Sequence, residues 1–195
     1  MEEIIKPRAI KHVYQVKDDY RTPSYLVTIL DSFISQNGYK TIYCPFDTDN
    51  SEFVRHFKEL GLKVINGDIK NGFDFFAHEI PADADCVISN PPFSVKLNIF
   101  KKCFTENKPF ALLMNFQAAH YQEIGKLFYD IEKQTGDAVQ FIIPDKKVSF
   151  DGKTSAFNTC YYTWKFTDKT HWIHLEHNNT NKHYKPAYSI VVGER

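Results

Sequence analysis

Four consecutive residues, Asn90-Pro91-Pro92-Phe93, carry the groups needed to hold an amino nitrogen while it is alkylated. The Asn90 side chain and the Pro91 main chain each offer a carbonyl oxygen, and together they can accept both hydrogens of an amino group. Bound in this way, the nitrogen becomes pyramidal and its lone pair can attack an electrophilic methyl group. The proline rings restrict the backbone, and Phe93 offers a flat face for stacking. These residues predict methyl transfer to an amine, although Asn-Pro-Pro also forms ordinary rigid turns.

The position of this tetrapeptide favours a role in catalysis. The five residues before it, 85–89, read Asp-Cys-Val-Ile-Ser, and their apolar centre is typical of a strand that is covered on both faces. In open α/β sheets, ligands bind at the carboxyl ends of the strands. We therefore expect Asn90 to lie at the ligand-binding edge of a sheet.

Short apolar stretches alternate with helical patterns over about 145 residues, which predicts an α/β domain with a mostly parallel sheet. Strands are expected at 41–44, 62–65, 85–89, 110–114, 138–143, 160–166 and 171–177. Helices are expected at 23–36, 51–60, 97–104 and 121–133, with Ser51 as an N-cap. The turn at 167–170 separates the last two strands and predicts an antiparallel hairpin at the end of the sheet.

The tetrapeptide after an apolar strand resembles the hallmark of S-adenosylmethionine-dependent amino-methyltransferases. Its Asn-Pro-Pro-Phe form resembles the adenine-specific (N6) DNA methyltransferases. The resemblance covers 18–166 of the single domain expected over 1–195, and leaves 167–195 as a C-terminal extension. It implies a Rossmann-like class I methyltransferase fold with an antiparallel C-terminal strand and helices on both faces. It also implies S-adenosylmethionine as cofactor and the exocyclic amino group of adenine in DNA as acceptor.

Two further segments resemble the cofactor motifs of this family, in the expected order. The resemblance implies that Tyr20, Thr22 and Pro23, before the first helix, cap the methionine end of the cofactor. It implies that the Asp74 carboxylate accepts from the amino group of the cofactor's adenine while Phe75 packs on the ring.

A later segment, 143–150, resembles the family motif that holds a flipped base against the catalytic loop. The resemblance assigns this role to Phe150, opposite Phe93, with Phe157 as the second candidate. Lys147 is a basic neighbour of Phe150 that could meet phosphate. Stacking is worth about 1–3 kcal/mol per base, which would help offset the few kcal/mol needed to extract the base from a duplex.

The loop after the first expected strand departs from the family pattern. It reads Cys-Pro-Phe-Asp-Thr-Asp-Asn-Ser over 44–51 and lacks the glycines that let a backbone approach a cofactor closely. Its first five residues resemble the loop of phage-encoded relatives. On this resemblance we assign Phe46 to the cofactor site, and Asp47 or Asp49 to the methionine amino group.

A second departure is the short distance between the two cofactor motifs. About 29 residues separate Phe46 from Phe75, fewer than two complete βα units need, so one unit is expected to be abbreviated. Asp68, soon after the second expected strand, is then the candidate that would bind the ribose.

The composition argues against several other classes of protein. Lys and Arg total 24 and Asp and Glu total 24, which does not favour a general polyanion-coating surface. The four cysteines form no Cys-x-x-Cys pair, and the histidines at 171, 174 and 177 would alternate between strand faces, so no metal site is expected. No apolar run of about 18 residues occurs, and the first residues lack the apolar core of a signal peptide, so we expect a soluble cytoplasmic protein without a membrane partner.

Two alternatives remain open. The same tetrapeptide serves methyltransferases that act on RNA or on protein glutamine, so the expected partner is nucleic acid, with DNA favoured and RNA second. The glycine-free loop also fits a catalytically degenerate methyltransferase fold that binds nucleic acid or a partner protein. Neither the target sequence nor the oligomeric state follows from the residues.

Overall fold

The computed structural model describes residues 21–69, 72–150, 153–154 and 158–175. The helices are α1 Ser24–Thr28, α2 Asp31–Asn37, α3 Glu52–Glu59, α4 Lys96–Thr105 and α5 Gln122–Thr135, with short 3-10 helices η3 Phe93–Val95 and η4 Phe116–His120. The strands are β1 Thr41–Cys44, β2 Lys63–Asn66, β3 Cys86–Ser89, β4 Phe110–Asn115, β5 Gln140–Pro144, β6 Ser149–Phe150, β7 Lys153–Thr154, β8 Thr159–Trp164 and β9 His171–Ile173.

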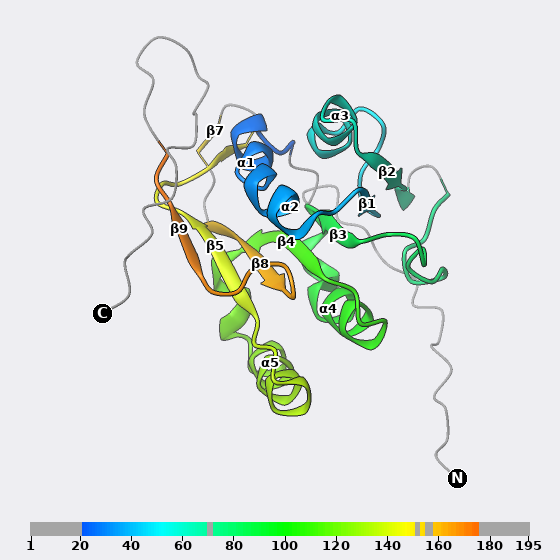
Figure 1. Cartoon of the computed structure of the whole chain (residues 1–195). Helices are drawn as coiled ribbons and strands as arrows, with labels where there is room; N and C mark the ends of the chain where they lie inside the picture. The colour runs from blue at the N-terminus through cyan, green and yellow to red at the C-terminus, as the bar shows by residue number, and fades with distance from the viewer. Residues whose placement is uncertain (1–20, 70–71, 151–152, 155–157, 176–195) are drawn as a thin grey trace.

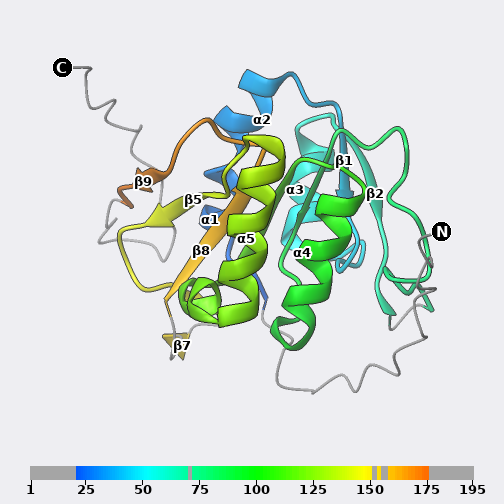
Figure 2. The same cartoon turned by 90° about the horizontal axis from the view of Figure 1, so that it is seen from below.

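These elements form three layers. A central sheet lies between α1, α2 and α3 on one face and α4 and α5 on the other (Figure 1, Figure 2). Its seven strands follow the order β2-β1-β3-β4-β8-β5-β9, and β6 pairs with β7 in a separate ribbon. The four strands β2, β1, β3 and β4 are parallel, whereas β8 is antiparallel to both of its neighbours, β4 and β5. The predicted Rossmann-like α/β class, with an antiparallel strand late in the chain and helices on both faces, is confirmed.

The predicted hairpin between the last two strands is wrong. Strand β5 lies between β8 and β9, and β9 pairs with β5 in parallel, from Ile142 with His171 to Pro144 with Ile173. The cause is the position of β8, which is buried along its whole length and hydrogen-bonded on both sides. No edge of β8 is left for β9, so the chain crosses to the outer side of β5.

The first predicted helix is broken into α1 and α2. In a continuous helix the Leu26 carbonyl would accept from the Leu30 N–H. Here it accepts from the buried Tyr161 hydroxyl at 2.8 Å, and the Leu30 N–H bonds to the Val27 carbonyl at 3.0 Å instead. The β-branched Val27, Thr28 and Ile29 add a low helix propensity at the same point. The other predicted helices are present, and Ser51 caps α3 by accepting from the Val54 N–H at 3.3 Å.

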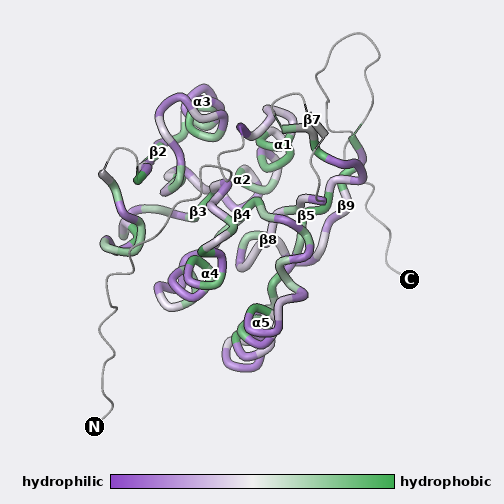
Figure 3. The backbone as a smooth tube through the Cα atoms, turned by 180° about the vertical axis from the view of Figure 1, so that it is seen from behind, coloured by the Kyte–Doolittle hydropathy of each residue, from purple (hydrophilic) through white to green (hydrophobic). Residues whose placement is uncertain are grey.

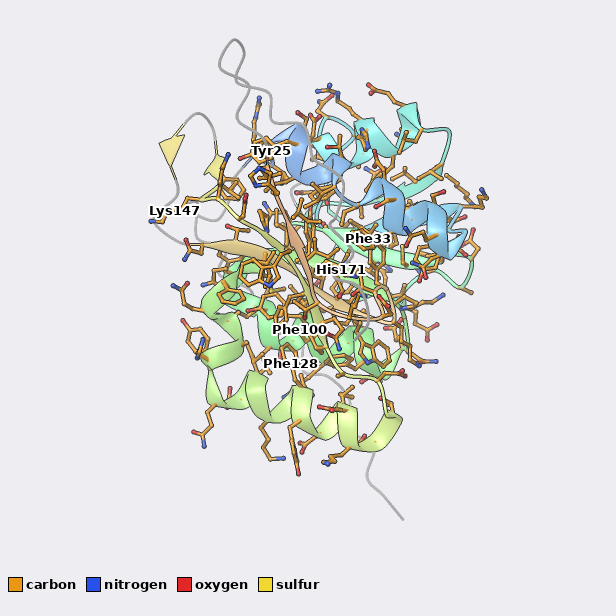
Figure 4. All side chains as sticks on the ribbon, turned by 60° about the vertical axis from the view of Figure 1, so that its left-hand side comes forward. Tyr25, Phe33, Phe100, Phe128, Lys147 and His171 are labelled. Carbon is orange, nitrogen blue, oxygen red and sulfur yellow. The ribbon has the colours of Figure 1, made fainter. Side chains whose placement is uncertain are left out.

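Two apolar clusters, one on each face of the sheet, form the core. The cluster under α1, α2 and α3 contains Leu26, Phe53 and Tyr161, while the cluster under α4 and α5 contains Phe100 and Trp164. Figure 4 shows Phe33 beside His171 on the first face, with rings 4.9 Å apart, and Phe100 beside Phe128 on the second, 5.0 Å apart. Much of the high aromatic content therefore fills the core.

The surface helices are amphipathic. Figure 3 shows hydrophilic and hydrophobic residues mixed along α5, as expected of a helix with one face on a sheet. Within the described ranges, no helix combines the length and the apolar character needed to cross a membrane.

Candidate active site

The tetrapeptide 90–93 lies at the carboxyl edge of the sheet, as predicted. Strand β3 is buried at every residue and ends at Ser89, and Asn90 follows directly. Pro91 and Pro92 are buried, and half-buried Phe93 begins η3, which leads into α4. Because β3 lies between β1 and β4, which are both parallel to it, the loops after these three strands meet at the same edge.

The segment before α1 reaches this edge and contacts Asn90. The Asn90 side-chain nitrogen Nδ2 donates to Thr22 Oγ1 at 3.2 Å, across 68 residues of sequence. Pro23 is the N-cap of α1, so the helix start fixes the position of Thr22. This bond uses the donor end of the Asn90 amide, and the acceptor end is the one that binding of an amino group requires. Tyr20, predicted to act with Thr22, lies outside the described residues.

Asp47, in the loop after β1, is buried and bonded within the protein. Its side chain is 7% exposed, and its Oδ2 accepts from the Ser89 hydroxyl. Its main chain is also held, because the Asp47 N–H donates to the Gly67 carbonyl at 3.0 Å and its carbonyl accepts from Asn66 Nδ2 at 3.2 Å. The loops after β1 and β2 and the end of β3 are therefore joined at Asp47.

Burial also changes the acidity of this carboxyl. Desolvation raises the pKa of Asp47 to about 7, against the opposing effect of hydrogen bonds from Ser89 and Ser51. The negative charge of Asp68 raises it further. Asp49, the alternative to Asp47, is exposed and pairs with Lys58 of α3 at 2.9 Å.

A small pocket beside the loop after β1 is lined by three of the predicted cofactor residues, Phe46, Asp74 and Phe75. Phe46 and Phe75 pack edge to face with ring centroids 4.9 Å apart. The Asp74 carboxylate faces the following turn, where its Oδ1 accepts from the Phe76 N–H at 2.9 Å. The remaining lining residues are Pro45, Ile69, Phe73, Phe76 and Val95.

The connection that carries this pocket is short, as expected from the spacing. Strand β2 is the edge strand of the sheet, and between β2 and β3 the described residues 67–69 and 72–85 contain no α-helix and no strand. Turns take the place of a βα unit, and they bring Phe73 against Gly67. A Cβ on Gly67 would lie 2.4 Å from Phe73 Cδ1, so only glycine fits there.

The predicted opposite wall of the target pocket involves Phe150, with Phe157 as second candidate, and Lys147. Phe150 is 3% exposed and packs in the cluster under α1, α2 and α3, whereas Phe93 packs against the cluster on the other face. Lys147 is exposed and points outward near the β6–β7 ribbon (Figure 4). Phe157 lies outside the described residues. The clamp formed by Phe93 and Phe150 stays a prediction.

The structure also places at this edge one residue that the sequence did not single out, Ser89, and joins Lys96 to the catalytic loop. Ser89 binds Asp47, and Lys96 Nζ donates to the Phe93 carbonyl at 3.1 Å. Ser89 could have been noticed as a polar residue that ends an apolar strand directly before Asn90. Among the described residues no group of three or more potential metal ligands occurs; His177 and His183 fall outside them.

Comparison with solved structures identifies the class of fold. The chain resembles the crystal structure of a modification subunit assigned to a type I restriction enzyme from Vibrio vulnificus YJ016, with a TM-score of 0.51 and 10% sequence identity. The match covers 87% of this chain and 50% of that chain, so the protein spans half the length of the subunit. No protein-family model and no curated protein matches. The protein therefore has a methyltransferase-like fold.

Proposed function

We propose that the protein transfers a methyl group from S-adenosylmethionine to the exocyclic amino group of adenine in DNA. The observation that carries the proposal is the position of Asn90-Pro91-Pro92-Phe93 at the carboxyl edge of a methyltransferase-like sheet, with Thr22 bonded to Asn90. The modification subunit that the chain resembles belongs to a restriction enzyme, which favours DNA over RNA or protein as the acceptor.

The side chains that line the pocket at 45–46 and 73–76 are of the types that would bind the adenine end of the cofactor. An adenine ring is flat and carries an amino group at its edge, so the aromatic rings of Phe46 and Phe75 and the carboxylate of Asp74 suit it. Thr22 and Pro23 would hold the methionine end, with Asp68 near the ribose. When bound, S-adenosylmethionine supplies the methyl group. Asp47 is less suited to contact a ligand directly, because Ser89 and the protein interior already engage it.

The side chains of Asn90 and Phe93 and the main chain of Pro91 supply the chemistry at the acceptor. Asn90 Oδ1 and the Pro91 carbonyl accept the two amino hydrogens, and Phe93 stacks on the base. The amino nitrogen held in this way would take the methyl group that the cofactor supplies as the sulfur–carbon bond breaks, and it would then lose a proton to water. The acceleration comes mainly from holding the two reactants in line, so neither a covalent enzyme intermediate nor a general base is needed.

Transfer of labelled methyl groups into DNA, RNA and protein, offered separately, tests the proposal. We expect label in adenine of DNA. Asn90→Ala should lower the rate at least about 100-fold, the usual loss when one preorganised hydrogen-bonding group of an active site is removed. It should leave the urea midpoint nearly unchanged. Gln134→Ala, which removes an exposed amide near the end of α5, is the matched control. Full turnover in Asn90→Ala would refute the assignment, and label in RNA or glutamine would change the substrate.

A catalytically degenerate module that binds nucleic acid or protein is the second candidate. The observation that favours it is the glycine-free loop closed around buried Asp47. Calorimetry with S-adenosylmethionine separates the two readings. Millimolar ligand that gives neither heat nor thermal stabilisation would support the degenerate module, because a ligand that binds the folded state stabilises it.

A further inference from the structure

We infer that Tyr121 is a stacking platform for a nucleobase next to the target amine. This inference rests on the proposed function and deepens it, because it assigns a nucleotide contact beside the tetrapeptide. Tyr121 lies between η4 and α5, after the carboxyl end of β4. Because β4 is the parallel neighbour of β3, Tyr121 and Phe93 follow strands that end at the same edge of the sheet.

Lys96 joins Tyr121 to the catalytic loop. Its Nζ donates to the Phe93 carbonyl at 3.1 Å and lies 4.3 Å from the centre of the Tyr121 ring. The ring is therefore next to the tetrapeptide and carries a positive charge on one of its faces. A nucleotide strand that delivers a base to Asn90 would meet both groups, since the ring can stack on a neighbouring base and the ammonium can meet phosphate.

The Tyr121 side chain is exposed. It is 53% exposed, and Phe116, at the start of the same segment, is 37% exposed. Single exposed aromatic rings are common on protein surfaces and need no explanation by themselves. Here the exposed ring lies against Lys96, whose Nζ binds the Phe93 carbonyl, and this link to the catalytic loop distinguishes it from the exposed Tyr129 of α5.

The segment that carries the platform is held on the sheet by hydrogen bonds. The Tyr162 hydroxyl accepts from the Ala119 N–H at 3.0 Å and lies 2.8 Å from the Phe116 carbonyl, to which it donates. The Phe116 N–H donates to the Asn158 carbonyl at 2.8 Å. Four hydrogen-bonding groups of 116–119 and 158 are thus fixed on the sheet, so stacking on Tyr121 would not require a loop to be ordered first.

Stacking beside the target has a physical purpose. A base that leaves the helix deprives its neighbour of a stacking partner, which costs a few kcal/mol. An aromatic ring at the edge of the pocket can replace that partner. The proposed ligand of Tyr121 is a nucleobase that flanks the acceptor base, and both DNA and RNA contain such a base.

Fluorescence anisotropy with the full chain tests the platform. The probe is a fluorescein-labelled single-stranded DNA of about 12 nucleotides, with one adenine between thymines, and its RNA counterpart forms a second arm. We expect Tyr121→Ala to weaken binding about tenfold, the effect of losing one base–aromatic stack, and Tyr121→Phe to bind as the natural chain does. The matched control is Tyr129→Ala, because Tyr129 is 60% exposed and has Lys133 Nζ 5.5 Å from its ring, but lies two turns further along α5. It should bind normally.

An abasic probe separates stacking from a general loss of binding. Removing the two bases that flank the adenine should weaken binding to the natural chain about tenfold and leave binding to Tyr121→Ala nearly unchanged. Equal losses in both proteins, normal binding by Tyr121→Ala, or no binding of either probe by the natural chain would overturn the inference. If Tyr121→Ala binds the probe and transfers methyl groups normally, the platform is rejected and the proposed function stands. Binding that depends on Tyr121 without any methyl transfer would support the platform and reject the proposed function.

Discussion

The buried carboxyl of Asp47 should make the stability of the protein fall as the pH rises. Its pKa is raised by burial to about 7 in the folded protein, against about 3.9 for aspartate in an unfolded chain. Because the folded state holds this proton more tightly, the destabilising effect of ionisation is absent below about pH 4 and complete above about pH 7. Each pKa unit corresponds to about 1.4 kcal/mol, so the free energy of unfolding should fall by about 2 kcal/mol between about pH 5 and pH 7.

Asp47→Asn isolates this effect, because it keeps the shape of the side chain and an oxygen that can accept from Ser89 but cannot ionise. Urea unfolding, followed by the fluorescence of buried Trp164, gives the free energy at each pH. We expect the natural chain to lose about 2 kcal/mol relative to Asp47→Asn over this range. Asp49→Asn is the control from the same loop, since pairing with Lys58 lowers the pKa of exposed Asp49 out of the range. Parallel pH profiles for Asp47→Asn and the natural chain would refute the reasoning.

Two further substitutions test the packing that shapes the site. Gly67→Ala would place a Cβ 2.4 Å from Phe73 Cδ1, so the ring must move. We expect the free energy of unfolding in urea to fall by about 1–3 kcal/mol and cofactor binding in calorimetry to weaken. Unchanged values of both would show that the ring moves freely. Tyr161→Phe removes the donor to the Leu26 carbonyl; we expect a loss of about 1–3 kcal/mol for the unsatisfied carbonyl, and equal stability would show that Leu30 takes over as donor.

The sequence predicted those parts of the fold that depend on local pattern. Strand β3 and the capped helix α3 follow from short apolar runs and from Ser51, which act within a few residues. The break between α1 and α2 was missed because its cause, the Tyr161 hydroxyl, lies 135 residues further along the chain. The hairpin prediction failed for a similar reason, since a turn between two strands does not reveal that β5 occupies the position between them.

The candidate site was predictable where it depends on the order of motifs along the chain. Asn90 follows β3 and Thr22 precedes α1, and the two residues meet at the carboxyl edge of the sheet. Phe46 follows β1, Asp74 and Phe75 lie in the connection after β2, and the three line one pocket. Burial of individual side chains was not predictable in this way. The positions of Asp47 and Phe150 in the interior depend on which residues pack over them, and these come from distant segments.

The loop after β1, which lacks the glycines of the family pattern, is closed in the structure. Where glycines would leave an open backbone, Asp47 closes the loop: its carboxylate accepts from the Ser89 hydroxyl, its carbonyl accepts from the Asn66 side chain, and its N–H donates to the Gly67 carbonyl. The close approach of backbone to an aromatic ring occurs instead at Gly67, after β2, against Phe73 of the pocket wall. Because Ser89 directly precedes Asn90, the residue that closes this loop also holds the start of the tetrapeptide 90–93. The proposed cofactor side of the site, at the loop after β1, is thus joined to the proposed acceptor side, at 90–93, through one buried carboxyl. A substitution at Asp47 should therefore affect both sides.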